Sequence, residues 1–393
     1  MAPFFPEEVC EPLFAFAMFR WAYNTPIKRT PYYYHHDFCS QVFSKKSIDD
    51  KLVSDMLKLV GENRTAVVAW MKSLLDKTGK GAVPPEFVMM DSTHVFSKSE
   101  LLTVNAKGYN PDFDFEKQVR LMYLFSAQTK QPVYYRLING NITDIKSMSL
   151  CIEEMNIQNV IYITDKGFYS KENIAMMKAQ NLQYILPLQR SNQLINYEPL
   201  QKANFKSALE YFIYQNGIVW YYKYQSEARN FITFLDEGLR AKEEADYVAR
   251  TTSHPENYTK EKFAEKLSGF GTLTFTYDIQ SDKTPEEIYC AYQQRNEIET
   301  IFDAHKNFLK ADLMYMQNRY VLEGWLTANF IAMIAYHKLY IRLKDINKLS
   351  KHSPKDIMEL SKPIYKLNMN GEWKTSEISK KNIDITCCAF RLS

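Results

Sequence analysis

The sequence changes its hydrophobic period near residue 86, and this change limits the fold more than any other feature. Residues 7–75 carry apolar side chains at helical spacing, whereas short apolar runs of strand length follow residue 86. We expect strands at 87–90, 119–126, 133–138, 160–164 and 184–186, and helices at 144–155 and 170–180. Three strands of antiparallel type, followed by helix, strand, helix and strand, predict a mixed α/β layer.

Residues 191–283 interrupt this pattern with one that is rich in strands. The pair Asn216-Gly217 stands between two apolar runs and suits a tight hairpin turn. We expect strands at 211–214, 218–224, 231–235 and 272–277, around a charged helical stretch at 239–266. Because a structureless connection of this length is unusual in a compact domain, we predict a folded, β-rich subdomain inserted into the α/β layer.

The helical pattern resumes at Thr284, which is followed by Pro285 at the first helical position and by Glu287 in a capping-box position. We expect this helix to run to about residue 310 and the remaining chain to be mostly helical with a polar tail. The predicted division is a helical N-terminal region at 1–80, the first part of the core at 85–190, the inserted β-rich subdomain at 191–283, the Thr284 helix with the rest of the core at 284–345, and a C-terminal tail at 346–393.

Composition excludes several classes of protein. The 49 Lys and Arg residues nearly balance 46 Asp and Glu, so the net charge of +3 neither indicates a nucleic-acid binder nor excludes a local basic patch. Six cysteines without a Cys-x-x-Cys pair do not suit a disulfide scaffold or a zinc ribbon. The longest apolar run, 325–336, is too short to cross a membrane, and the first residues lack the features of a signal peptide. We therefore expect a soluble, cytoplasmic protein.

Two aspartates follow expected strands directly, Asp91 after 87–90 and Asp165 after 160–164. The carboxyl ends of strands are where open α/β sheets bind ligands. Taken singly, such an aspartate is more often a cap for the following turn. A third acidic residue, on the Thr284 helix, makes a shared site the better interpretation.

That helix carries Tyr292, Arg295, Glu299 and Lys306 on one stripe. At 100° per residue the four side chains project within an arc of about 60°. The neighbouring arc is apolar and is expected to pack on the sheet; it contains Ile298, Ile301, Phe302 and Leu309. An ordinary surface ion pair between Arg295 and Glu299 is the simpler alternative, but it leaves the other two residues unexplained.

With these residues the chain resembles the DDE transposases of bacterial insertion sequences, specifically the insertion-sequence-four group. The signature of that group is Tyr, two residues, Arg, three residues, Glu, six residues and Lys, and it is matched at every position by Tyr292, Arg295, Glu299 and Lys306. The resemblance also covers Asp-Ser-Thr at 91–93, Asp-Lys-Gly-Phe-Tyr at 165–169 and the β-rich insertion. Three motifs in the right order make it specific.

The resemblance implies a ribonuclease-H-like catalytic core, in which a mixed five-stranded sheet is flanked by helices. Asp91, Asp165 and Glu299 would be the catalytic residues and would hold two Mg²⁺ ions, with Mn²⁺ as a substitute. Two metal ions that flank a phosphate activate the attacking hydroxyl and stabilise the leaving oxygen. Carboxylate oxygens are the ligands that Mg²⁺ prefers, so three acidic residues suffice.

The same resemblance implies DNA contacts along the helix. Arg295 and Lys306 would contact phosphates, and Tyr292 would stack on or hydrogen-bond the DNA end. Lys166 is a further candidate, and Arg190 a weaker one, for contacts to the DNA backbone.

Two aromatic residues have competing interpretations. Trp220 could supply a stacking surface for DNA, although a role in the core of its hairpin is the simpler interpretation. His94 could touch the site, but a structural or solvent-facing role is at least as good an explanation.

The expected function is therefore cleavage of DNA at the ends of the element and joining of the 3′ ends to target DNA. The expected partners are double-stranded DNA, as terminal inverted repeats and as target, and a second copy of the chain on paired ends. No membrane partner is expected, and the protein would be associated with the bacterial nucleoid when bound to DNA.

Two alternatives remain open at this point. Only 90 residues precede Asp91, which is short for the group and suggests a truncated or decayed copy that binds DNA without transposing. A ribonuclease-H-like nuclease with another substrate, such as a branched-DNA resolvase, would leave the helix stripe and the β-rich insertion without a role.

Overall fold

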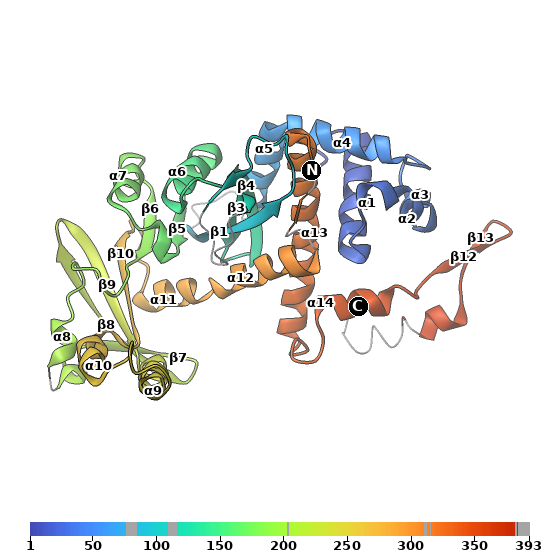
Figure 1. Ribbon diagram of the computed structural model, residues 1–393. Helices are drawn as coiled ribbons and strands as arrows, with labels where there is room; N and C mark the ends of the chain where they lie inside the picture. The colour runs from blue at the N-terminus through green and yellow to red at the C-terminus, as the bar shows by residue number, and fades with distance from the viewer. Residues whose placement is uncertain are drawn as a thin grey trace.

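The computed structural model describes residues 1–75, 85–108, 116–202, 204–309, 313–314, 316–381 and 383. The boundary expected near residue 80 and the helix end expected near residue 310 lie outside these residues. The chain forms one large mixed sheet with helices packed around it, and its N-terminal and C-terminal helices lie side by side at one end (Figure 1). Among the described residues, no helix is long and apolar enough to span a membrane.

Helices make up the N-terminal part, as the sequence predicts: α1 (Glu7–Tyr23), α2 (Thr30–His36), α3 (Cys39–Val42), α4 (Asp50–Glu62) and α5 (Arg64–Leu75). The side chain of Asp49 caps α4 by accepting from the backbone N–H of Leu52. The long helix α13 (Arg319–Asp345) comes from the other end of the chain and packs against both α1 and α4.

Two glycines allow α4 and α13 to approach closely. A Cβ at Gly324 would lie 1.9 Å from the backbone oxygen of Leu57, and a Cβ at Gly61 would lie 1.9 Å from that of Tyr320. Both contacts are with backbone, which cannot move aside as a flexible side chain can. These two helices therefore need glycine at their crossing.

Gly324→Ala should lower the free energy of unfolding by about 1–3 kcal/mol, because the added methyl group would push apart two helices whose backbones are in close contact. Urea denaturation measures this change. Lys58→Ala, at an exposed position on α4, serves as the control and should change stability by less than about 0.5 kcal/mol. Equal effects of the two substitutions would contradict the close packing.

The first half of the sheet follows the expected order. Its elements are β1 (Glu86–Ser97), β2 (Ala106–Lys107), β3 (Lys117–Ser126), β4 (Gln131–Asn139), α6 (Asp144–Met155), β5 (Val160–Thr164), α7 (Lys171–Ala179) and β6 (Gln183–Pro187). β1 pairs antiparallel with β3 and parallel with β5, and β5 pairs parallel with β6. The prediction of a mixed α/β layer is confirmed.

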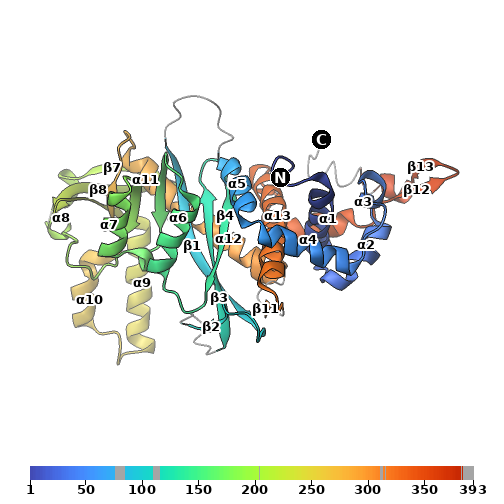
Figure 2. The same cartoon turned by 90° about the horizontal axis from the view of Figure 1, so that it is seen from above.

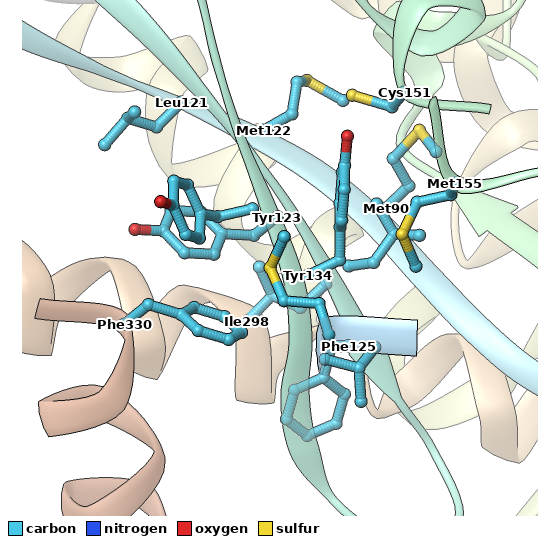
Figure 3. Packing of buried hydrophobic residues seen from close by; sticks show 14 of the residues in the cluster. Met90, Leu121, Met122, Tyr123, Phe125, Tyr134, Cys151, Met155, Ile298 and Phe330 are labelled. Atoms are coloured by element: carbon cyan, nitrogen blue, oxygen red, sulfur yellow. The ribbon is translucent and has the colours of Figure 1, made fainter. Parts of the chain in front are cut away.

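The two faces of this sheet are covered by different helices (Figure 3). Successive residues of β3 point to opposite faces, so that Met122 lies near Cys151 of α6 while Tyr123 stacks on Phe330 of α13 with ring centroids 6.4 Å apart. All four side chains are buried. The sheet is thus the centre of a continuous core that extends into the helical end of the molecule.

The β-rich insertion is folded, but it is not separate from the core sheet. It contains α8 (Glu198–Gln201), β7 (Glu210–Tyr214), β8 (Gly217–Ser226), β9 (Arg229–Asp236), α9 (Glu237–Ser253), α10 (Lys260–Lys266) and β10 (Thr272–Asp278). β10 pairs antiparallel with the core strand β6, so the order β6-β10-β9-β8-β7 extends the sheet. The expected five strands are therefore part of an 11-stranded sheet.

The hairpin predicted at Asn216-Gly217 forms one residue earlier. Its turn residues are Gln215 and Asn216, with φ angles of 45° and 64°, while Gly217 pairs with Tyr214. Two successive positive φ angles are what a tight hairpin with two central residues requires.

The C-terminal half contains α11 (Pro285–Gln293), α12 (Asn296–Asp303), a π-helical turn (Ala304–Phe308), β11 (Leu313–Met314), α13, α14 (Pro354–Ser361), β12 (Lys366–Met369) and β13 (Glu372–Thr375). The polar tail therefore includes a short helix and an exposed hairpin (Figure 1). The buried guanidinium of Arg20 on α1 donates to the backbone oxygen of Leu309 and, at 3.1 Å, to Asn329 on α13. This contact fixes the end of the α12 segment against the helical part.

Candidate active site

The register of the sheet brings Asp91 and Asp165 together. Met90 on β1 and Thr164 on β5 form the last pair of the parallel ladder, and the two aspartates are the next residues on the two strands. Beyond this point β5 ends, whereas β1 continues to Ser97 because it remains paired with β3. The prediction that Asp91 ends its strand is wrong, but Asp91 does lie beside the end of β5.

The expected continuous helix from Thr284 to about residue 310 is also wrong. Thr284 does form the predicted capping box with Glu287. However, α11 ends at Gln293, α12 begins at Asn296, and a π-helical turn follows α12. A single set of helical angles therefore does not relate Tyr292 to Lys306, whereas Arg295 and Glu299 remain one turn apart.

Arg295 lies in this helix break and joins two of the three acidic residues. Its Nη1 forms an ion pair with Oδ1 of Asp165, and its Nη2 donates to Oε1 of Glu299 at 3.0 Å. The side chain of Arg295 is 24% exposed, compared with 57% for Glu299. The ion pair between Arg295 and Glu299, which was the simpler alternative, is present. Arg295 also pairs with Asp165 at the end of β5, so it links the two acidic residues.

Asp91 has a pKa raised to about 7, mainly because burial disfavours its charged form. The backbone N–H of Ser92 lowers the pKa through a hydrogen bond of 2.8 Å to Oδ1, and the charge of Asp165 raises it. For Arg295, burial is the largest single influence and lowers the pKa, but the charges of Asp165, Tyr292 and Asp91 and the hydrogen bond to Glu299 together outweigh it, so that the net pKa is raised. Negative charge is therefore concentrated where Arg295 is bound.

Asp91→Asn should stabilise the metal-free protein at about pH 8. An unfolded carboxyl group titrates near about 3.9, whereas the folded group has a pKa of about 7. The folded state therefore loses stability as the pH rises between these values, and the penalty is complete above about pH 7. We expect the substitution to raise the free energy of unfolding by about 1–2 kcal/mol at pH 8 and by almost nothing near pH 4.

Urea denaturation in EDTA at the two pH values measures this difference. Equal gains at pH 4 and pH 8 would mean that the stabilisation is unrelated to ionisation of the carboxyl group.

The donor chemistry of the site fits a divalent cation. Three carboxylates offer the hard oxygen ligands that Mg²⁺ and Mn²⁺ prefer, and a cationic group already contacts Asp165 and Glu299. Within the part of the chain that the structure describes, no three acidic, histidine or cysteine side chains form a cluster that could hold a metal in the present arrangement. Two of the three expected ligands face the guanidinium of Arg295 instead.

The candidate DNA residues on this segment lie at different depths. Tyr292 is half-buried, with its ring edge-on to Phe275 at 4.8 Å and the guanidinium of Arg295 at 5.9 Å. Burial raises the pKa of Tyr292 to about 12. Lys306 lies in the π-helical turn and is half-buried, while Lys166 is exposed in the turn directly after Asp165.

The remaining candidates have other partners. Trp220 on β8 donates to Glu237 of α9 at 3.1 Å and packs on Tyr211 of β7, so these contacts lie within the insertion. Arg190 donates to Glu243 at 2.9 Å and to the backbone of Thr272. His94 is half-buried, with its ring edge-on to Phe96.

A polar network that sequence reasoning missed supports both aspartate motifs. Oδ1 of Asp144, at the start of α6, accepts from Ser92 at 2.8 Å and forms an ion pair with Arg120 on β3. A Cβ at Gly167 would lie 3.5 Å from the other oxygen of Asp144. The sequence shows Asp144 only as an acidic residue in the first turn of a helix, a common stabilising position, and gives no sign of these partners.

The chain matches the family described as Transposase DDE domain over residues 84–335. None of the curated proteins matches it. It is similar to the piggyBac transposase in a synaptic complex with hairpin DNA, with 8% identity over 90% of this chain and 69% of that chain and a TM-score of 0.44. It is also similar to the Mos1 transposase in a paired-end complex with the left transposon end, with 14% identity over 35% of this chain and 50% of that chain and a TM-score of 0.19. Because the family match covers well over half of the sequence, the protein belongs to the Transposase DDE domain family.

Proposed function

We propose that this transposase is a member of the insertion-sequence-four group that cleaves DNA at the ends of its own element and joins the 3′ ends to target DNA. The observation that carries the proposal is the meeting of Asp91, Asp165 and the Glu299 segment at one place on the sheet. Asp91 and Asp165 follow the last pair of a parallel ladder, and Arg295 joins Asp165 to Glu299. A ribonuclease-H-like core would account for this arrangement.

Asp91, Asp165 and Glu299 are the residues that would hold two Mg²⁺ ions. Bound there, the ions would activate the attacking hydroxyl and stabilise the leaving oxygen of the phosphodiester. The protein contributes the position and charge of the ligands. The N–H of Ser92 orients the carboxylate of Asp91, and Asp144 holds the side chain of Ser92 from the start of α6.

Cations near these ligands would bind and orient the DNA. Arg295 offers a planar fork that suits a phosphate, and Lys306 lies further along the same segment. Lys166 is exposed one residue after Asp165. Tyr292 presents a half-buried ring beside Arg295, so it would contact the DNA end at its edge. The DNA would be the terminal repeats of the element, held as a pair by two copies of the chain.

The test is a cleavage assay on a plasmid that carries the genomic DNA flanking the coding region. We expect Mg²⁺-dependent breaks at the boundaries of the element, and joining of the new 3′ ends to a second plasmid, which sequencing of the junctions detects. A plasmid with scrambled flanking DNA is the control.

Two results would contradict the proposal. Binding of the flanking DNA without cleavage would indicate a decayed copy. Cleavage confined to branched junctions would indicate a resolvase.

A further inference from the structure

Arg295 makes contacts that a phosphate-binding residue does not need. Its two terminal nitrogens contact different carboxylates, one on Asp165 and one on Glu299. Hydrogen bonds between ionised groups are among the strongest in proteins, and this side chain is mostly shielded from solvent. The guanidinium therefore occupies oxygen atoms that would otherwise be available to a metal ion.

A metal ion and this guanidinium would compete for Oδ1 of Asp165 and Oε1 of Glu299. Mg²⁺ binds oxygen at about 2.0–2.1 Å and requires nearly octahedral geometry. A cation already hydrogen-bonded to Asp165 and Glu299 would both block the approach and repel a second positive charge. Arg295 and the metal therefore compete for these two carboxylates.

The position of Arg295 in the chain allows it to exchange partners. It lies between the end of α11 at Gln293 and the start of α12 at Asn296, so it is not in the middle of a regular helix. Its fork geometry fits a phosphate as well as it fits two carboxylates. An arriving DNA phosphate could thus take the guanidinium from the acidic residues.

We propose that Arg295 closes the metal site of the free transposase and that binding of a DNA end opens it by drawing the guanidinium to a phosphate. This inference rests on the proposed function, because it assumes that Asp165 and Glu299 are metal ligands. It makes metal loading depend on DNA, so that the free protein is a poor nuclease even when Mg²⁺ is abundant.

The test measures Mn²⁺ binding to the full chain without DNA, by the loss of the free-ion signal in electron paramagnetic resonance. We expect Arg295→Gln to bind Mn²⁺ at least about ten-fold more tightly than the unmodified protein, because two charge-assisted hydrogen bonds no longer compete. Lys171→Gln is the matched control. It removes an exposed positive charge six residues after Asp165, at the start of α7, so it should change the affinity by less than about three-fold.

A second arm uses the unmodified protein with a 40-base-pair duplex from the DNA that flanks the coding region. Adding the duplex should tighten Mn²⁺ binding by about the same factor as Arg295→Gln does, and it should have little further effect on that variant. This arm does not require the variant to fold.

The outcomes separate this inference from the proposed function. Equal Mn²⁺ affinity of the unmodified protein and Arg295→Gln, or an affinity that DNA does not change, would overturn the competition while leaving the metal site in place. Equal tightening of Mn²⁺ binding by Arg295→Gln and Lys171→Gln would show that any lost positive charge has this effect, and it would also overturn the competition. No Mn²⁺ binding to either protein, with or without DNA, would refute the metal site itself.

Discussion

Asp165→Asn should reduce cleavage at the ends of the element by at least about 10³-fold, which corresponds to about 4 kcal/mol of activation free energy. The substitution keeps the shape of the side chain but removes the negative charge that would hold a metal ion and that now pairs with Arg295. DNA binding should change by less than about three-fold, because the loss of an acidic group does not remove a phosphate contact. Single-turnover cleavage and a gel-shift assay measure the two effects.

Asp303→Asn is the control for this experiment. Asp303 is an exposed acidic residue at the end of α12, and its carboxylate accepts a hydrogen bond from Asn307. We expect this variant to cleave within about three-fold of the unmodified protein. Full cleavage by Asp165→Asn, or an equal loss in both variants, would remove Asp165 from the catalytic set.

Replacing residues 237–270 with Asn-Gly should reduce processing of the ends by about 10- to 100-fold while preserving the fold and the metal site. These residues form the arm of α9 and α10, which extends from the sheet (Figure 2). The strands on either side of the arm are already adjacent, because the N–H of Asp236 donates to the backbone oxygen of Gly271 at 3.0 Å. A two-residue turn can therefore close them into a hairpin.

The expected loss comes from DNA contacts. The arm carries exposed cations, Lys242, Lys260 and Lys262, and each lost phosphate contact should reduce the logarithmic salt slope of binding by about one. The measurements are the salt dependence of DNA binding, cleavage of the ends, and Mn²⁺ affinity. Unchanged cleavage would show that the arm is not part of the DNA path. A loss of Mn²⁺ affinity would show instead that it supports the metal site.

Removal of the whole β-rich insertion would be a poorer experiment than removal of the arm. Strand β10 pairs with β6 along the residues from Phe275 to Asp278, and Phe234 and Phe275 belong to the main hydrophobic core. Deletion of 191–283 would expose both an unpaired strand edge and apolar side chains, so that the loss of activity would have no clear cause.

Local patterns in the sequence identify most strands of the first half of the sheet and both aspartate motifs. The short apolar runs before Asp91 and Asp165 are buried strands, and the alternation of strands and helices gives the mixed layer. These features depend on neighbouring residues, which a single sequence displays directly. The hairpin near Asn216 is visible for the same reason, with an error of one residue in its turn.

The features that were not predicted depend on partners far away in the chain. The extension of β1 beyond Asp91 depends on pairing with β3, and the joining of the insertion to the core depends on pairing between β6 and β10. The break before α12 has neither proline nor glycine to mark it. At this break Arg295 contacts Asp165, which is 130 residues away, and no helical periodicity can reveal such a contact.

The continuity of the sheet from β3 to β7 limits how this molecule can open around a duplex. Rotation of the insertion relative to the core would break the backbone hydrogen bonds between β6 and β10. We therefore expect the insertion and the core sheet to move together as one rigid unit. Motion that would admit DNA would take place elsewhere, and the interruption of the helix between Gln293 and Asn296 is a candidate hinge beside Asp165 and Glu299, the proposed metal ligands. Binding of the DNA end and rearrangement of the residues around Arg295 would then occur in one movement.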